Sequence, residues 1–269
     1  MSEPLPLVIV VTGSTDGIGK ATASALLATG AHVIVHGRNK PRVDAAVAEL
    51  TAAHPGALLE GISFDLGSMS AVRNGANALL SRLPRIDVLI NNAGIFASER
   101  LVTADQMEAT FAVNHAASVL LTALLLPRLL ASPRPTIINV SSLAHSRGRI
   151  HLDDLSLAGS FTGYAAYAQS KLANVMHALD LAAAHPRLHA YSLHPGVIGT
   201  KLLREGFGPV RGASVADGAR TSVGLATGTI AAPSGSYLSD GVVTPCAASA
   251  QDAELRAALA AETNRLVGL

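Results

Sequence analysis

Residues 7–19 read LVIVVTGSTDGIG, a run of β-branched residues that passes directly into a turn with glycines at 13, 17 and 19. The apolar run predicts a buried strand, and the residues after the turn have the pattern of a helix. In such a turn, glycine lets backbone amides approach a pyrophosphate at the positive amino end of the helix. The spacing differs from the common GxGxxG fingerprint, and because structural turns use glycine as well, the turn alone is weak evidence.

Short apolar runs alternate with Ala- and Leu-rich helical patterns along the whole chain. Predicted strands cover residues 7–11, 32–35, 58–64, 87–90, 136–140 and 188–193, and predicted helices cover 17–29, 40–53, 69–83, 104–130 and 164–184. This alternation predicts an α/β fold with a doubly wound, Rossmann-type parallel sheet covered by helices on both faces. A helix from about Ser214, a short strand near Tyr237 and a helix from about Ala250 complete it. No linker, composition break or internal repeat divides the chain, so we expect a single domain over residues 1–269.

The composition is that of one large soluble domain. Of the 269 residues, 49% are hydrophobic and 14% charged, and the formal net charge is +1. These values predict a full core and give no basic footprint for nucleic acid, which we therefore exclude as a partner. A single cysteine, Cys246, excludes an intrachain disulfide, and neither an HExxH motif nor a Cys/His cluster indicates a metal site.

Neither the amino terminus nor the apolar stretches indicate a membrane. The start, MSEPLPLVIVVTG, contains an acidic residue and two prolines and lacks the charged and apolar regions of a secretory signal. The most apolar later stretch, residues 118–126, falls well short of the ~18 to 20 residues that a membrane span needs. We therefore expect a soluble, cytoplasmic protein with no membrane partner.

The stretch YAAYAQSK, residues 164–171, contains two tyrosines, of which only Tyr167 has a lysine, Lys171, four positions later. Residues four apart share one face of a helix, so the phenol and the ammonium can reach a common point. On its own, a YxxxK pattern is more often a surface tyrosine and lysine than a chemical pair.

The stretch HGRN, residues 36–39, follows the second predicted strand, where an NAD site usually places an acidic residue against the ribose 2′-hydroxyl. Here Gly37 takes that place and is followed by Arg38, whose guanidinium can pair with a 2′-phosphate. The sequence thus favours NADP(H), while NAD(H) stays open for two reasons. Arg38 in a solvated loop would have no such role, and Asp16 adds a negative charge nearby.

These motifs, together with others in the same order, resemble the short-chain dehydrogenase/reductase family in its TGxxxGIG form. The matching pieces are TGSTDGIG (12–19), FDL with Asp65, NNAG (91–94), VNH with Asn114, NVSS ending at Ser142, YAQSK, and HPGVIGT (194–200). Any one piece could arise by chance, but the ordered set identifies the chain as a member of this family.

The resemblance implies a catalytic set of Asn114, Ser142, Tyr167 and Lys171. Tyr167 would be the general acid and base, Ser142 would orient and polarise the substrate oxygen, and Asn114 would join a water-linked proton relay. Lys171 would hydrogen-bond the nicotinamide ribose.

The resemblance also implies a set of cofactor contacts at the ends of the predicted strands. Within it, the residues after the third strand would contact the adenine, and those after HPG would contact the nicotinamide carboxamide. The implied cofactor-binding residues are Gly13, Ser14, Thr15, Asp16, Gly17, Ile18, Gly19, Arg38, Asn39, Asp65, Leu66, Asn91, Ala93, Gly94, Tyr167, Lys171, Pro195, Gly196, Ile198 and Thr200.

The implied reaction is hydride transfer between NADP(H) and the carbonyl or alcohol carbon of a fairly apolar small molecule. Oxidation needs a base at the alcohol oxygen, and reduction needs an acid there. A free tyrosine has a pKa of about 10, too high for an efficient base near neutral pH. We therefore expect the Lys171 ammonium, with the positive oxidised nicotinamide, to lower the pKa of Tyr167.

Within the family, the chain most resembles the retinol-dehydrogenase-like branch, in NVSSLAHSRGRIHLDDL, YAQSKLANVM, LHPGVIGTKL, YLSDG and RLVGL. The loop between Ser142 and Tyr167 is longer than in many members, so residues 146–163 would border the substrate entrance. The irregular segment at about 197–214 would cover the substrate. We expect His145 to be solvated rather than to contact substrate. The family also implies a homodimer or homotetramer.

Two other functions fit parts of the pattern. A dinucleotide-binding sensor or scaffold would use the same fold without turnover, but it would not need all four residues of the catalytic set. A sugar-nucleotide epimerase or dehydratase shares the YxxxK chemistry, but the glycine spacing and the short carboxy-terminal part leave no separate substrate domain.

Overall fold

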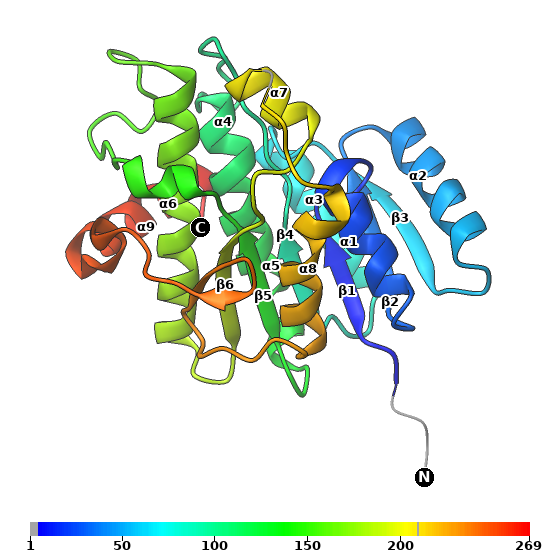
Figure 1. The fold of residues 1–269 in the computed structure, drawn as a ribbon. Helices are drawn as coiled ribbons and strands as arrows, with labels where there is room; N and C mark the ends of the chain where they lie inside the picture. Colours follow the sequence, from blue (N-terminus) through cyan, green and yellow to red (C-terminus); the bar gives the residue numbers. More distant parts are fainter. Residues whose placement is uncertain (1–4, 209) are drawn as a thin grey trace.

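The computed structural model describes residues 5–208 and 210–269 and confirms the predicted sheet (Figure 1). Within these residues the strand order is β3-β2-β1-β4-β5-β6-β7-β8. Neighbours from β3 to β7 are parallel, and the unpredicted β8 pairs antiparallel with β7. The strands are β1 (Val8–Val11), β2 (His32–Gly37), β3 (Leu59–Ser63), β4 (Val88–Asn91), β5 (Thr136–Val140), β6 (His189–His194), β7 (Tyr237–Ser239) and β8 (Val242–Val243).

Helices cover both faces of the sheet, as predicted. They are α1 (Gly17–Leu27), α2 (Lys40–Ala53), α3 (Met69–Arg82), α4 (Ala109–Phe111), a π-helical turn η1 (Ala112–Ala116), α5 (Ala117–Leu130), a 3₁₀ turn η2 (Leu143–Arg147), α6 (Gly163–Ala184), α7 (Lys201–Phe207), α8 (Val215–Thr227), a 3₁₀ turn η3 (Ala248–Gln251) and α9 (Ala253–Val267).

The alternation of side chains along the strands divides the core into two halves. Ile9 and Val11 of β1 pack with residues of α1, α2 and α8, whereas Val10 between them packs with residues of α3, α5 and α6. Successive strand residues point to opposite faces, so a sheet buried on both sides needs the continuous apolar runs seen in this sequence.

The predicted helix over 104–130 begins later than expected, at Ala109. Glu108 is the reason: it is 1% exposed, and its carboxylate accepts the amides of Thr110 and Phe111, both at 2.7 Å. A carboxylate that accepts the first free amides of a helix marks its start. The residues before it form a turn that includes Gln106 at φ 60°.

Residues 109–130 then form one continuous helical segment, longer than the apolar stretch 118–126 suggested. By length and composition this segment is sufficient to cross a membrane, but 67% of its apolar window is buried inside the molecule. Leu120, Leu121 and Leu125 belong to the core half shared with α3 and α6. Packing against the sheet and the neighbouring helices thus explains why this segment is apolar.

The loops after β1 and β4 meet because β1 lies between β2 and β4, where the strand order reverses. A Cβ added at Gly13, which has φ +63°, would lie 2.7 Å from Cα of Ala93. A Cβ at Gly19 would lie 2.3 Å from the Gly13 carbonyl oxygen and 2.4 Å from Nδ2 of Asn92. Glycine at both positions is therefore a packing requirement at this switch point, where doubly wound folds bind their ligands.

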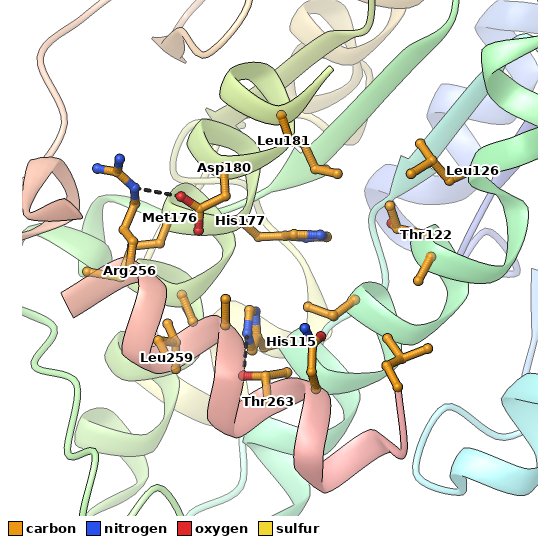
Figure 2. Close-up of a pocket in the computed structure, with 17 residues that line it drawn as sticks. His115, Thr122, Leu126, Met176, His177, Asp180, Leu181, Arg256, Leu259 and Thr263 are labelled. Atoms are coloured by element: carbon orange, nitrogen blue, oxygen red, sulfur yellow. Dashed lines mark hydrogen bonds and ion pairs between the residues drawn. The ribbon is translucent and has the colours of Figure 1, made fainter. Parts of the chain in front are cut away.

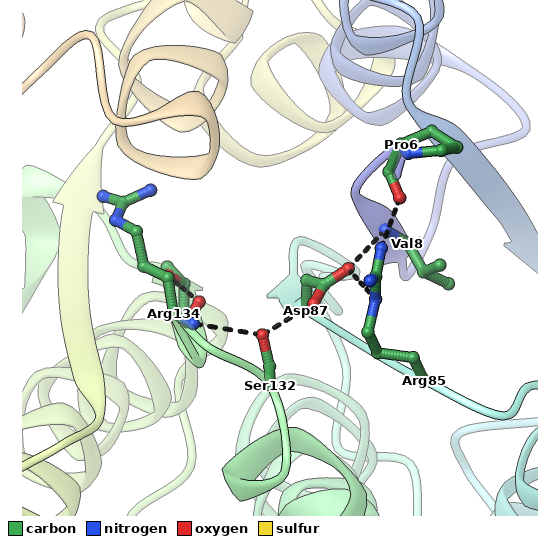
Figure 3. A network of polar contacts seen from close by, with 7 residues as sticks. Pro6, Val8, Arg85, Asp87, Ser132 and Arg134 are labelled. Carbon is green, nitrogen blue, oxygen red and sulfur yellow. Dashed lines mark hydrogen bonds and ion pairs between the residues drawn. The ribbon is translucent and has the colours of Figure 1, made fainter. Parts of the chain in front are cut away.

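At the opposite end of the sheet, Asp87 joins three segments (Figure 3). Its Oδ2 accepts from the Val8 amide at 2.8 Å and from Nε of Arg85 at 2.9 Å, and its Oδ1 accepts from Oγ of Ser132 at 2.6 Å. The residue is 1% exposed, and Arg85 also donates to the Pro6 carbonyl at 2.6 Å. The carboxylate thereby ties the start of β1 to the segments before β4 and β5.

Replacing Asp87 by Asn should lower the free energy of unfolding by about 2–4 kcal/mol, because an amide cannot accept from all three donors at once. Urea unfolding of the two proteins checks this. Asp44→Asn, which breaks an exposed ion pair with Lys40, should change the value by less than about 1 kcal/mol. An equally small loss of unfolding free energy in both variants would contradict the role of Asp87 in joining these segments.

Candidate active site

The glycine loop is held in place by His36, which is not among the predicted site residues. The Gly13 amide donates to Nδ1 of His36 at 3.2 Å, and Nε2 of His36 donates to the Phe64 carbonyl at 3.0 Å. Burial lowers the pKa of His36 to about 4, so the ring is neutral and keeps one donor and one acceptor. Ser14, also buried, donates from Oγ to the Val11 carbonyl at 2.7 Å. No sequence pattern distinguishes this histidine from an ordinary strand residue.

The amino end of α1 fits a pyrophosphate. Asp16 caps the helix by accepting from the Gly17 amide at 2.7 Å, with its carboxylate exposed. The next amides, of Ile18 and Gly19, find no acceptor in residues 5–208 and 210–269. Free amides together with the helix dipole are the donor set that a phosphate group needs.

The residue that follows β2, Arg38, is basic rather than acidic. A Cβ at Gly37 would lie 2.5 Å from the Thr15 methyl, so a larger residue here would displace the glycine loop. Arg38 is exposed, and Asn39 caps α2 by accepting from the Arg42 amide at 3.3 Å. The guanidinium is therefore accessible at the carboxyl end of β2.

After β3, the chain exposes Asp65 and buries Leu66. Oδ1 of Asp65 accepts from the Gly67 amide at 2.8 Å, which fixes the turn. Both residues border the same edge of the sheet as the glycine loop, because β3 is parallel to β2.

Within NNAG, the two asparagines have different roles. The side chain of Asn91 is 1% exposed and donates to Oδ1 of Asn139 at 2.9 Å, so it joins β4 to β5 and points away from the surface. Asn92, absent from the predicted set, donates from Nδ2 to the carbonyls of Thr12 and Gly13 at 2.8 and 3.1 Å. The amide of Ala93 donates to Oγ1 of Thr12 at 3.0 Å. This turn thus supports the glycine loop.

Tyr167 and Lys171 lie near the start of α6, beside the carboxyl end of β5. The Tyr167 and Ser142 side chains are hydrogen-bonded to each other. Nζ of Lys171 lies 5.5 Å from the centroid of the Tyr167 ring and donates to the Val140 carbonyl at 2.9 Å. Lys171 is 3% exposed and Tyr167 is 6% exposed. The structure therefore brings the predicted serine, tyrosine and lysine together in a dry environment.

Asn114 lies in the π-helical turn η1, a rare geometry that occurs often at functional sites. Its Oδ1 accepts from the Ile95 amide at 2.8 Å, and its Nδ2 donates to Oγ of Ser170 at 3.0 Å. A Cβ added at Gly94 would lie 3.2 Å from Nζ of Lys171 and 3.5 Å from Oδ1 of Asn114. The asparagine and the lysine therefore both border Gly94.

In the protein alone, the pKa of Tyr167 is not lowered as expected for the site with Lys171 and an oxidised nicotinamide. Burial raises the pKa of Tyr167 to about 12, and the hydrogen bond with Ser142 only partly opposes this effect. Burial also lowers the pKa of Lys171 to about 8. Both shifts have the same physical cause, because a low-polarity environment disfavours a phenolate and an ammonium alike. The phenol is thus held protonated.

The segment after β6 turns at Pro195 and Gly196, the latter with φ +93°. Ile198 is 4% exposed and forms a parallel bridge with Ala213. A Cβ added at Gly17 would lie 3.7 Å from the Thr200 methyl, so this segment lies beside the glycine loop.

The short helix α7, which Thr200 caps, lies beyond the carboxyl ends of the strands, in yellow in Figure 1. Leu202 of α7 and Phe96 pack with Tyr167, and the rings of Phe96 and Tyr167 are 5.8 Å apart between centroids. A Cβ at Gly206 would lie 2.8 Å from the Phe96 ring. The predicted covering segment of about 197–214 thus rests on the candidate site, and residue 209 lies outside the described residues.

The expectation that His145 is solvated is wrong. His145 is 2% exposed, its Nδ1 donates to the Ser142 carbonyl at 2.8 Å, and its Nε2 accepts from the Ala247 amide at 3.1 Å. Its ring also lies 4.4 Å from that of Tyr237, measured between centroids. The histidine joins the candidate serine's turn to the carboxy-terminal segment.

Comparison with known proteins agrees with this geometry. The family model described as short chain dehydrogenase matches residues 7–207, so the chain belongs to the short-chain dehydrogenase family of oxidoreductases. Retinol dehydrogenase 13 of Homo sapiens is 35% identical over 280 aligned positions, covering 97% of this chain and 84% of that protein. Retinol dehydrogenase 14 of Homo sapiens is 37% identical over 216 positions, covering 73% of this chain and 63% of that protein. The predicted resemblance to the retinol-dehydrogenase-like branch is confirmed.

Solved structures show the same fold. A protein from Mycobacterium paratuberculosis superimposes with a TM-score of 0.81 at 32% identity, covering 98% of this chain and 96% of that one. A short chain dehydrogenase from Shigella flexneri, complexed with NADP, gives a TM-score of 0.73 at 23% identity, covering 88% and 97%. The second likeness concerns the fold alone.

Replacing Lys171 by Met should change how stability depends on pH. The pKa of about 8 in the folded protein lies below the ordinary value of 10.5, so the unfolded chain binds the proton more tightly between these values. The wild type therefore carries the full cost of the buried charge below pH 8, on the order of 3 kcal/mol, and loses it as pH rises. The variant has no such cost.

Melting temperatures of both proteins at pH 7 and pH 9.5 check this. The melting temperature of Lys171→Met minus that of the wild type should be larger at pH 7 than at pH 9.5. A difference that does not change with pH would mean that Lys171 is not a buried ammonium.

Proposed function

We propose that the chain is an NADP(H)-dependent oxidoreductase that interconverts the carbonyl and alcohol forms of a fairly apolar small molecule, with Tyr167 as general acid and base. The observation that carries the proposal is the grouping of the four side chains: Tyr167 is bonded to Ser142 and lies beside Lys171, and both Lys171 and Asn114 border Gly94. A sensor or scaffold protein would not need these four groups gathered in one dry site.

In the reduction direction, Tyr167 gives its proton to the carbonyl oxygen. The raised pKa keeps the phenol protonated at neutral pH, and Ser142 holds the same oxygen from the other side. The nicotinamide, when bound, supplies the hydride. Proton transfer at the oxygen prevents the build-up of alkoxide charge, which a dry site would not stabilise.

In the oxidation direction, Tyr167 must accept the alcohol proton as a phenolate. The Ser142 hydrogen bond favours the phenolate, and a Lys171 ammonium that turns from the Val140 carbonyl toward the phenol would favour it further. Asn114, which bonds the backbone of Ile95 and Oγ of Ser170, is held in position to anchor the water that would exchange protons with Lys171.

The substrate class follows from the surroundings of Tyr167. Phe96 packs beside the Tyr167 ring and Leu202 packs against the same small apolar cluster, so the carbon skeleton of the substrate would contact apolar groups. The relatives named as retinol dehydrogenases support an apolar alcohol or aldehyde. Segment 197–214 would cover the substrate, and the loop 146–163 would border its entrance.

The preference for NADP(H) rests on Arg38 and Gly37. An exposed guanidinium can pair with a 2′-phosphate, and the close approach of Thr15 leaves no room at position 37 for the carboxylate of an NAD site. Location in the cytoplasm and assembly as a homodimer or homotetramer complete the proposal.

Replacing Tyr167 by Phe should reduce turnover of an apolar aldehyde by at least about 100-fold, because the proton donor is lost. NADPH affinity should change by less than about threefold. Tyr164→Phe, one turn earlier in α6, is the matched control and should retain near-normal turnover. Near-normal turnover in Tyr167→Phe would remove Tyr167 from the mechanism.

Replacing Arg38 by Ala should weaken NADPH binding about tenfold or more, since a charge-assisted contact with the 2′-phosphate is lost. NADH, which has no such phosphate, should bind with nearly unchanged affinity. Titration of both cofactors measures the two constants. Equal losses for NADPH and NADH would rule out a phosphate role for Arg38.

A further inference from the structure

A cavity of about 330 Å³ lies between α5, α6 and α9, on the face of the molecule where the chain's last helix packs (Figure 2). It is a separate place from the candidate active site. His177 in its wall follows Tyr167 by ten residues of α6, roughly 15 Å along the helix axis. A cavity of this size is at the lower end of the range for small-molecule sites.

Most of the cavity wall is apolar. Val119 and Leu126 of α5, Met176 and Leu181 of α6, and Leu259 of α9 contribute to it. At one side, Nε of Arg256 pairs with Oδ1 of Asp180 at 2.7 Å, so the charges there compensate each other. The wall thus favours a neutral, largely apolar occupant, because an uncompensated charge would lose its hydration without gaining a partner.

Two histidines lie in the wall, and they differ in whether a ring nitrogen remains free to hydrogen-bond a ligand. Nδ1 of His115 donates to Oδ1 of Asn174 at 3.2 Å, and its Nε2 accepts from Oγ1 of Thr263 at 3.4 Å. The direction follows from Asn174, whose Nδ2 donates to the Asn114 carbonyl at 2.9 Å, which leaves Oδ1 as the acceptor. Both nitrogens of His115 are therefore used inside the protein.

His177 keeps one donor for the cavity. Nδ2 of Asn139 donates to the Asn174 carbonyl at 3.2 Å, which identifies the amide end, and lies 3.3 Å from Nδ1 of His177. Nδ1 therefore accepts, and Nε2 carries the proton. Burial lowers the pKa of His177 to about 3, so the ring is neutral. In the described residues Nε2 has no partner, and Figure 2 shows the ring extending between residues of α5 and α9.

We propose that this cavity is a second small-molecule site, which takes a neutral, apolar molecule with one hydrogen-bond acceptor oxygen that binds Nε2–H of His177. The apolar wall binds the carbon skeleton, and the imidazole sets the position of the oxygen. Binding at this site does not depend on the function proposed above, because it uses no residue of the catalytic set.

Calorimetric titration with N,N-dimethylhexanamide tests the proposal. This probe has an acceptor carbonyl and a short alkyl chain, has no N–H donor, and is not reduced by a nicotinamide cofactor. The matched pair of variants is Ala260→Phe, which fills the cavity, and Ala261→Phe, an exposed neighbour on the same helix. His177→Phe keeps the ring and removes the donor.

We expect 1:1 binding to the wild type and to Ala261→Phe, at least tenfold weaker binding to Ala260→Phe, and about five- to tenfold weaker binding to His177→Phe. Equal affinity in wild type and Ala260→Phe would place the probe elsewhere and overturn the proposal. The proposal would also be overturned if the probe does not bind and light scattering shows a dimer that Ala260→Phe dissociates. A second copy of the chain would then cover the cavity. Unchanged affinity in His177→Phe would remove the acceptor requirement.

Discussion

The Lys171 ammonium is taken almost completely out of water, and its hydrogen bond is to the carbonyl at the end of β5. Burial lowers the pKa of such a group, and it limits which residues can stand nearby. Each neighbour must either hydrogen-bond the ammonium or be small enough not to displace it. Gly94 leaves room, and Asn114 is fixed beside it by the backbone of residue 95. The same dry surroundings keep Tyr167 protonated. One environment therefore explains both the lysine and the tyrosine.

Helix α6 contributes both to the candidate active site and to the wall of the cavity. Its first turns carry Tyr167 and Lys171 toward the ends of the strands, and its later turns line the cavity beside α9. Asn174 lies between these regions, donating to the Asn114 carbonyl and accepting from His115. The π-helical turn that holds Asn114 thus also contributes His115 to the cavity wall. The side chain of Asn174 therefore links the two regions by hydrogen bonds.

Patterns that depend on local spacing predicted much of the fold. The helix Lys40–Ala53 and the strand Thr136–Val140 agree residue for residue with the prediction, because apolar periodicity and β-branched runs report directly on burial. The start of the helix at Ala109 was missed, since Glu108 acts through a buried carboxylate cap that the apolar pattern does not reveal. The antiparallel β8 and the short α7 were missed because neither has a periodic pattern of its own.

The candidate site was predicted by residue type but not by environment. Sequence order supplied Ser142, Tyr167 and Lys171, yet the direction of the Tyr167 pKa depends on burial, which only the folded chain defines. Asn92 and His36 were not among the predicted site residues, and His145 was wrongly expected to be solvated, for a related reason. Their hydrogen bonds join segments far apart in the chain, so no local spacing identifies them.

The most direct test of the proposed chemistry is deuterium transfer from NADPH labelled at C4 of the nicotinamide, with each stereochemical form tried against apolar aldehydes, retinal among them. One of the two forms should deliver deuterium to the former carbonyl carbon of the product alcohol. The proposed chemistry would be contradicted if labelled NADPH binds to the protein and neither form delivers deuterium to any aldehyde.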